Sequence, residues 1–350
     1  MRLTLLSLLL IAAINLTGQS ENQGKFYLSG NTSFNYANNF QGTYEQASFE
    51  STYLGFFLTN KLLVGAEVIA GTDEDLYDDS PFVISPFVRY YLPINRVKNT
   101  QFFAEVGFGT FGNFGFGSSF ETDFHFGVGA ERNFGDGVVG TARLRYKANS
   151  SGLNYTELDL GLNFMLGGKQ AWDGAAFRKQ GAFLVDPTIG SIGFGHRSRG
   201  NLRDLRLNLN IGLGYFMTKN LLVEAGYNVE TIDVDRDGVG FQEFNSRDWQ
   251  AYLGLRYFLP TATRRWQPFV LARAGWAGAS SGFDDPTFGP QSNSENSGFS
   301  ELGAGTLYML TKKAALDVSL RYQSEGLDAP AGSPNAMVGS VGLKVFLGGK

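Results

Sequence analysis

The chain has 350 residues, with 46 Gly, 31 Phe, 15 Tyr and 10 Pro, a formal net charge of −4 and a pI of about 5.4. This acidic balance offers no basic surface for nucleic acid, and the absence of cysteine excludes disulfides and a lipid anchor on an N-terminal cysteine. Abundant glycine and aromatic residues in short alternating segments are typical of an all-β protein.

The first 20 residues predict a secretory signal peptide. Arg2 provides a short basic end, Leu3 to Ile14 form an apolar middle, and Thr17 to Ser20 form a small polar end where cleavage is expected. The alternative is a buried N-terminal strand or helix. The apolar run is shorter than the roughly 20 residues that a spanning helix requires. We therefore expect an exported chain without a helical membrane anchor.

The segments that follow alternate between apolar and polar residues. In "TELDLGLNFML" (156–166) and "LRLNLNIGLGYF" (205–216), one face is apolar and the other carries charges, amides and glycines. Such segments exceed the usual strand of about 5 or 6 residues. A polar face rich in glycine suits a narrow barrel lumen better than a solvated surface. Apolar-out, polar-in strands predict a transmembrane β-barrel, although composition alone would also allow a soluble sandwich.

The connections between these segments alternate in length. Short ones are expected at 59–61, 93–100, 134–137, 218–220, 260–266 and 311–313, and longer polar ones at 37–48, 71–80, 112–118, 148–153, 196–204, 231–248, 278–299 and 324–336. Bacterial barrels have short periplasmic turns and longer external loops. We therefore expect both termini and the midpoint in the periplasm, and the long loops outside the cell.

An internal repeat divides the chain. "LGFFLTNKLLVGAEV" (54–68) returns as "LGYFMTKNLLVEAGY" (213–227), "RYYLP" (89–93) as "RYFLP" (256–260), and "FMLGGK" (164–169) as "VFLGGK" (345–350). Such self-similarity predicts a duplicated unit, with eight strands expected in each of 25–166 and 183–347. The expected domains are a signal peptide (1–20), a first barrel repeat (21–166), a periplasmic linker (167–182) and a second barrel repeat (183–350).

Each half resembles an eight-stranded outer-membrane β-barrel domain of the OmpA/OmpX-like type. The resemblance rests on strand number, loop alternation and a last strand that ends on an aromatic residue. This chain continues past Phe346 to Lys350, whereas family members often end on the aromatic itself. The resemblance implies an integral outer-membrane protein of a Gram-negative bacterium. Its partners would be outer-membrane lipid, lipopolysaccharide and the barrel-insertion machinery.

Two architectures fit the duplication: two tandem eight-stranded barrels, or one sixteen-stranded barrel. Side chains just fill an eight-stranded barrel, whereas sixteen strands leave an aqueous channel. The inward positions combine glycines with bulky aromatic residues, namely Tyr53, Phe57, Phe87, Tyr91, Phe103, Tyr252 and Phe258. This mixture favours two filled barrels, and the single wide barrel stays open as the alternative.

Alternate positions on each expected strand face the barrel interior, and the charged residues at these positions predict a lumen charge network. Its members are Glu67, Arg89, Glu105, Glu121, Asp123, Arg143, Arg145, Glu157, Asp159, Arg206, Glu224, Arg256, Arg273, Glu301, Asp317 and Arg321. In the structural interpretation these charges pair across neighbouring strands, because a buried charge needs a partner. In the functional interpretation they form a selectivity ring or a gate.

The segment "DVDRDGVGFQE" (233–243) predicts a calcium site in the external loop 231–248. Asp233, Asp235 and Asp237 precede a glycine, as in the first half of a D-x-D-x-D-G calcium loop. Glu243 lies one position before the usual place of the last ligand. The alternative is an acidic loop that only stays solvated. No other cofactor is expected.

Catalysis has little support in the sequence. The two histidines are His125 and His196, and no serine motif accompanies either of them. We therefore expect a protein that is not an enzyme and that has a structural or surface-interaction role through its external loops. The alternative is a passive porin for small hydrophilic solutes.

Overall fold

The computed structural model describes residues 22–31, 33–39, 45–73, 80–93, 99–114, 120–150, 153–167, 179–197, 201–237, 244–261, 265–285, 289–325 and 336–348. All regular structure in these ranges is β-strand. The expected signal peptide and most of the expected linker lie outside the described residues. Within the described part of the chain, no helix is long and apolar enough to cross a membrane.

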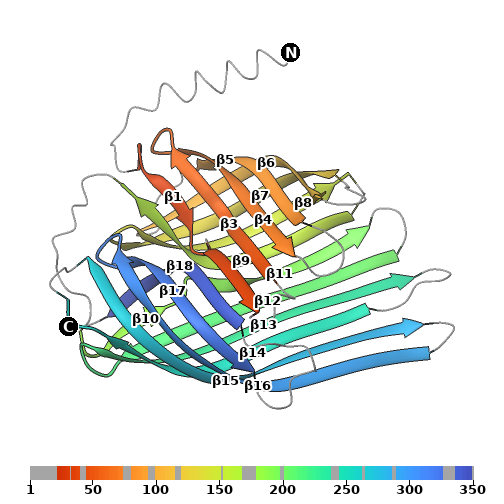
Figure 1. Ribbon diagram of the computed structural model, residues 1–350. Coiled ribbons are helices and arrows are strands. Elements are labelled where there is room, and N and C mark those ends of the chain that lie inside the picture. The colour runs from red at the N-terminus through yellow and green to blue at the C-terminus, as the bar shows by residue number, and fades with distance from the viewer. Residues whose placement is uncertain are drawn as a thin grey trace.

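The described strands fall into two sets that follow one another along the chain (Figure 1). The first set is β1 (Phe26–Ser29), β2 (Ser33–Asn39), β3 (Glu45–Phe57), β4 (Leu62–Asp73), β5 (Ser80–Tyr91), β6 (Thr100–Phe114), β7 (Phe120–Gly135), β8 (Val138–Asn149) and β9 (Leu153–Leu166). The second set is β10 (Ala182–Val185), β11 (Thr188–Arg197), β12 (Asn201–Phe216), β13 (Leu221–Asp237), β14 (Phe244–Phe258), β15 (Trp266–Asp285), β16 (Gly289–Met309), β17 (Ala314–Glu325) and β18 (Ala336–Gly348).

The repeated hairpin forms the same turn in both halves. Thr59 accepts hydrogen bonds on Oγ1 from the main-chain N–H groups of Lys61 and Leu62, at 3.2 and 3.0 Å. Thr218 does the same for Asn220 and Leu221, at 3.2 and 3.0 Å. A threonine hydroxyl that bonds the main chain two and three residues on stabilises a tight turn. The turns define one end of the molecule, which we call the short-turn end.

At the short-turn end each half closes on itself. Strand β1 pairs with β3 and β9, so that β1 and β3 to β9 form a ring of eight antiparallel strands. Strand β10 pairs with β12 and β18, and closes the second half in the same way. The prediction of two tandem eight-stranded barrels is confirmed at this end.

The two halves join toward the opposite end, where the longer loops were expected, and we call it the long-loop end. The prediction of a loop at 278–299 is wrong, because β15 extends to Asp285 and β16 begins at Gly289. At the long-loop end β2 pairs with β18 across 34–39 and 336–341, and β11 pairs with β9 across 188–197 and 153–161. The described strands at this level form one closed ring of sixteen, namely β2 to β9 and β11 to β18. The alternative of one sixteen-stranded barrel is therefore also present, at the end of the molecule opposite the short turns.

The change of pairing partner occurs at a break in the strand that begins each half, between β1 and β2 in the first half and between β10 and β11 in the second. The break after β1 begins with Gly30 and Asn31, and Asp186 and Pro187 separate β10 from β11. Proline lacks the N–H that a ladder needs, which explains a break at position 187. The carbonyl of Pro187 still accepts a hydrogen bond from the N–H of Leu162 at 2.9 Å, so the second half remains attached to β9.

The two eight-stranded rings also touch through their outer faces. A buried apolar cluster joins Val138 and Phe164 of the first half to Ala314, Leu343 and Val345 of the second. Positions of the same outward parity elsewhere, such as Phe126, are exposed as a lipid-facing surface would be. We call this group the contact cluster, and it holds the two rings side by side.

The interior of each ring is filled near the short-turn end. The buried residues inside the first ring are Tyr27, Tyr53, Phe57, Leu63, Phe87, Tyr91, Phe103, Val139 and Met165. Those inside the second are Ala182, Leu184, Phe216, Leu222, Phe258, Phe269, Leu271, Leu307, Met309, Ala315 and Phe346. We call these groups the first and second plugs, and they occupy the space that an aqueous channel would need.

Candidate functional site

The charges of the first half meet directly above the first plug. Arg89 is fully buried and pairs with Glu105 at 2.7 Å and with Glu131 at 2.5 Å. Arg143 pairs with the other oxygen of Glu105 at 2.9 Å and with Asp159. Each guanidinium therefore bridges carboxylates on different strands, which compensates part of the cost of removing these charges from water.

A second layer of charge lies nearer the long-loop end. Arg145 pairs with Glu67 and with Glu157, both at 2.7 Å. Lys147 lies 3.6 Å from each of the same two carboxylates. The Arg89 guanidinium also stacks 4.0 Å from the ring centre of Phe103, so that the ion pairs continue into the plug.

The second half has a corresponding network. Arg256 pairs with Asp317 at 2.8 Å and with Glu224 at 3.2 Å. Arg273 joins Glu224 at 2.5 Å to Glu301 at 3.5 Å, and Arg321 reaches Glu301 at 3.2 Å. Arg89 and Arg256, which occupy equivalent places in the repeat, therefore both form buried bridges to two carboxylates.

Three residues of the expected network lie outside these bridges: Glu121, Arg206, and Asp123, which lies beside His125. Glu121 is half-buried and makes no ion pair with another described residue. Arg206 is exposed, and it contacts Tyr155 of the first half, with an Nη2 to Oη distance of 3.4 Å. Glu121 and Arg206 lie farther from the plugs, toward the end where the two halves join.

His125 lies in a buried polar group with Asp123 and Ser85. Its Nδ1 is 3.4 Å from the hydroxyl of Ser85 and 3.7 Å from a carboxylate oxygen of Asp123, and its Nε2 is 3.8 Å from Glu105. In a hydrolytic triad the acid and the nucleophile contact opposite ring nitrogens. Here Ser85 and Asp123 both face Nδ1, and the carboxylate that faces Nε2, Glu105, already pairs with Arg89 and Arg143, so Glu105 belongs to the ion-pair network. Sequence reasoning placed Asp123 beside His125 but missed Ser85, which comes from β5.

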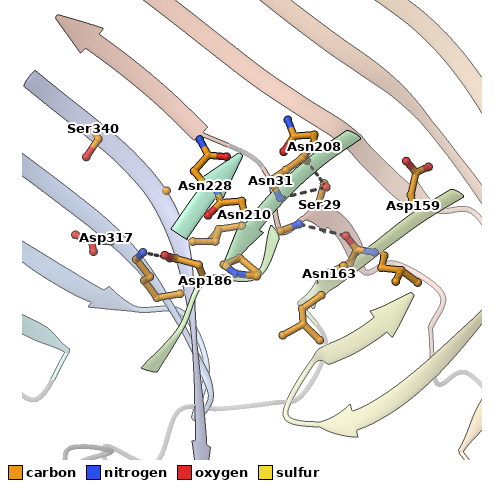
Figure 2. Close-up of a pocket in the computed structure, with 18 of the residues that line it drawn as sticks. Ser29, Asn31, Asp159, Asn163, Asp186, Asn208, Asn210, Asn228, Asp317 and Ser340 are labelled. Atoms are coloured by element: carbon orange, nitrogen blue, oxygen red, sulfur yellow. Dashed lines mark hydrogen bonds and ion pairs between the residues drawn. The ribbon is translucent and has the colours of Figure 1, made fainter. Parts of the chain in front are cut away.

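A cavity of about 790 Å³ lies above the two plugs, where the halves join. Residues from both halves line it, and Figure 2 shows Ser29, Asn31, Asp159 and Asn163 around it together with Asp186 and Asp317. The two interrupted strands form part of its wall. The Gly30 N–H donates to Asn163 Oδ1 at 3.2 Å on one side, and Lys344 pairs with Asp186 on the other.

Three amides form a row across one wall of the cavity. Asn210 on β12 lies opposite Asn228 on β13, which lies opposite Gln250 on β14. Neighbouring strands are about 4.8 Å apart, so the amides repeat at that interval. We call these residues the amide row. Sequence reasoning missed it, although counting outward from the turn at 218–220 gives the pairing of Asn210 with Asn228.

The expected calcium ligands occupy a different element from the one predicted. Strand β13 continues to Asp237, so Asp233, Asp235 and Asp237 lie on an extended strand and not in a loop. The side chains of Asp235 and Asp237, and all of Glu243, lie outside the described residues. Among the residues that are described, no three Asp, Glu or His side chains are grouped to hold a metal ion. Calcium binding at 231–248 stays a prediction.

Comparison with known proteins gives one match by family. Residues 166–345 match the family described as "Outer membrane protein beta-barrel domain". This segment covers the second repeat together with the end of β9. No curated protein matches the chain by sequence.

Several solved structures are similar in shape at low identity. A bacterial polysaccharide outer membrane secretin is 10% identical, with a TM-score of 0.45 over 95% of this chain and 100% of that one. The N-terminal β-barrel domain of OprF from Pseudomonas aeruginosa is 18% identical, with a TM-score of 0.26 over 48% of this chain and 98% of its own. OccAB3 of Acinetobacter baumannii is 10% identical, with a TM-score of 0.38 over 93% and 98%.

Proposed function

This chain belongs to the outer membrane protein β-barrel domain family, and from that premise we propose that it is a non-conducting barrel that acts at the cell surface through its long-loop end. The observation that carries the proposal is the filling of both eight-stranded rings. Each has an apolar plug near the short turns and buried ion pairs directly above it.

The plugs oppose passage of solutes for a physical reason. Aromatic rings from every second strand pack together: the ring centroids of Phe57 on β3 and Tyr91 on β5 are 5.5 Å apart, and those of Phe216 on β12 and Phe258 on β14 are also 5.5 Å apart. A hydrated solute would have to displace these packed groups and separate buried charge pairs, which costs several kcal/mol for each pair.

The lipid-facing surface supports a place in the outer membrane. Outward positions such as Leu253, Trp276 and Phe108 are exposed and apolar, as a membrane-spanning barrel requires. In this orientation the short turns and the termini face the periplasm, and the loops of the sixteen-stranded end face the medium. Outer-membrane lipid, lipopolysaccharide and the barrel-insertion machinery are the partners that this placement implies.

The experiment is single-channel conductance of the refolded full chain in a planar bilayer. The proposal expects no stable open steps, because both rings are plugged. Absent or small flickering steps would support it. Large and stable steps would contradict it and favour the second candidate, a passive porin for small hydrophilic solutes, for which the sixteen-stranded ring is the supporting observation.

A further inference from the structure

We propose that the cavity between the halves binds a short, uncharged oligosaccharide. The inference rests on the proposed function, because the ligand would enter from the long-loop end, and it adds the chemical class of the ligand. The volume of about 790 Å³ lies within the range of roughly 300–1,000 Å³ that is usual for ligand pockets.

The charges around the cavity argue against an ionic ligand. Among the described lining residues, six are basic and six are acidic: Arg143, Arg145, Arg256, Arg273, Arg321 and Lys344, against Glu67, Glu157, Asp159, Asp186, Glu230 and Asp317. Most of them already pair with one another, as Arg145 does with Glu157 and Lys344 with Asp186. Neither an anion nor a cation would therefore meet an excess of opposite charge.

The amide row supplies the chemistry that hydroxyl groups need. Each Asn or Gln side chain offers two donors and an acceptor, and a sugar hydroxyl both donates and accepts. Within the described part of the chain, the side chains of Asn210, Asn228 and Gln250 form no hydrogen bond to protein. Their hydrogen-bonding capacity is therefore available to a ligand.

Further polar groups in the cavity wall lack a protein partner. Oδ1 of Asp317 is buried without a hydrogen bond, although Oδ2 accepts from Arg256 at 2.8 Å. The Nε of Arg321 is also buried and unpaired. Such groups are rare, but protein encloses both atoms and leaves them almost no accessible surface, so a ligand would be held by the amide row and not by these two atoms.

An aromatic ring lies beside the amide row. Tyr252 lies opposite Gly226 on the next strand, and a β-carbon at Gly226 would be 2.2 Å from that ring. The glycine thus lets the ring lie flat against the wall, where Arg273 stacks 4.6 Å from its centre. The main chain at Gly226 and the Arg273 guanidinium therefore cover the faces of the ring, and a ligand would meet the polar edge of the tyrosine.

Isothermal titration calorimetry on the refolded full chain in detergent tests the proposal. The probes are three neutral trisaccharides, maltotriose, cellotriose and triacetylchitotriose, at concentrations up to about 10 mM. At least one is expected to bind, and Asn228→Ala with Gln250→Ala is expected to weaken that binding about tenfold or more. The matched control is Asn293→Ala, which removes an exposed amide from β16 outside the cavity and leaves the affinity unchanged.

The contrary results are equally defined. Failure of all three trisaccharides to bind would overturn the proposal. Unchanged affinity in the Asn228→Ala, Gln250→Ala double variant would also overturn it, provided that the variant migrates as a folded protein on a gel. Tighter binding of a trisaccharide that bears sulfate or carboxylate would overturn the inference that the ligand is uncharged. Conductance is measured separately, so the two proposals can fail independently. A protein that conducts and binds a neutral trisaccharide would contradict only the proposed function. A protein that does not conduct and binds no trisaccharide would contradict only this inference.

Discussion

The main-chain N–H of Gly30 donates to Oδ1 of Asn163 at 3.2 Å, at the point where the first strand leaves β9. A β-carbon at Gly30 would lie 1.9 Å from the carbonyl oxygen of Leu162, a distance that no side chain tolerates. The close approach of Gly30 to β9 therefore allows β1 to close the first ring while β2 turns toward β18.

Gly30→Ala is expected to destabilise the protein by about 1–3 kcal/mol, because the added methyl group forces the main chain apart. The measurement is the urea midpoint at which the folded band disappears on a cold gel. Gly342→Ala is the matched control, since a β-carbon there meets nothing within 4 Å. Equal midpoints for the two variants would contradict this account of the strand switch.

Engineered cysteine pairs test the sixteen-stranded end, and the absence of native cysteine keeps the result unambiguous. Leu158 lies opposite Ile192 between β9 and β11, and Asn35 lies opposite Ser340 between β2 and β18. Directly opposed residues of antiparallel strands have Cα atoms about 4.5–5.5 Å apart, within the roughly 4.4–6.8 Å that a disulfide spans, so mild oxidation should link each pair. The readout is a mobility shift of the unfolded chain on a non-reducing gel.

The control for cross-linking is Ser319→Cys with Ser340→Cys, within the β17–β18 hairpin, where the hydroxyl oxygens are 2.8 Å apart. If that pair links and both pairs between the halves do not, the two barrels are separate along their whole length.

Arg89→Met is expected to cost about 3–5 kcal/mol of unfolding free energy, since it leaves Glu105 and Glu131 buried without their shared cation. Addition of Glu131→Gln should recover part of the loss by removing one unpaired charge. Arg206→Met, at an exposed position, serves as the comparison and should change the urea midpoint little. An Arg89→Met protein as stable as the parent would show that the bridge contributes nothing to the plugged state.

Phe164→Ala tests the contact cluster between the rings. Phe164 is 0% exposed although its parity points outward, whereas Phe126 has the same parity and is 49% exposed. Loss of the buried ring should cost about 3–5 kcal/mol, because a cavity remains between the two halves. Phe126→Ala should cost less, since lipid or detergent chains fill the space. Equal losses in urea unfolding would mean that the rings do not touch there.

The sequence by itself determined which side chains face inward and that the chain contains two equivalent halves, because alternation and repetition are both visible in it. Successive side chains on a strand face opposite sides, so the parity of Arg89 and Arg256 predicted two inward charges, and the structure places both in buried bridges. The recurrence of "LGFFLTNKLLVGAEV" as "LGYFMTKNLLVEAGY" predicted two equivalent hairpins, which have the same threonine turn. The position of a turn also sets the register of its hairpin, so the pairing of residues in the amide row could have been predicted from the sequence.

Only the tertiary structure decided which edges meet. The free edges of β9 and β18 present the same main-chain N–H and C=O groups, so no local pattern states whether β2 completes its own ring or joins the other half. The structure uses both solutions: β1 closes on β9, and β2 pairs with β18. The cavity and the outward-facing contact cluster both follow from that change of partner, which is why neither could be predicted from one strand at a time.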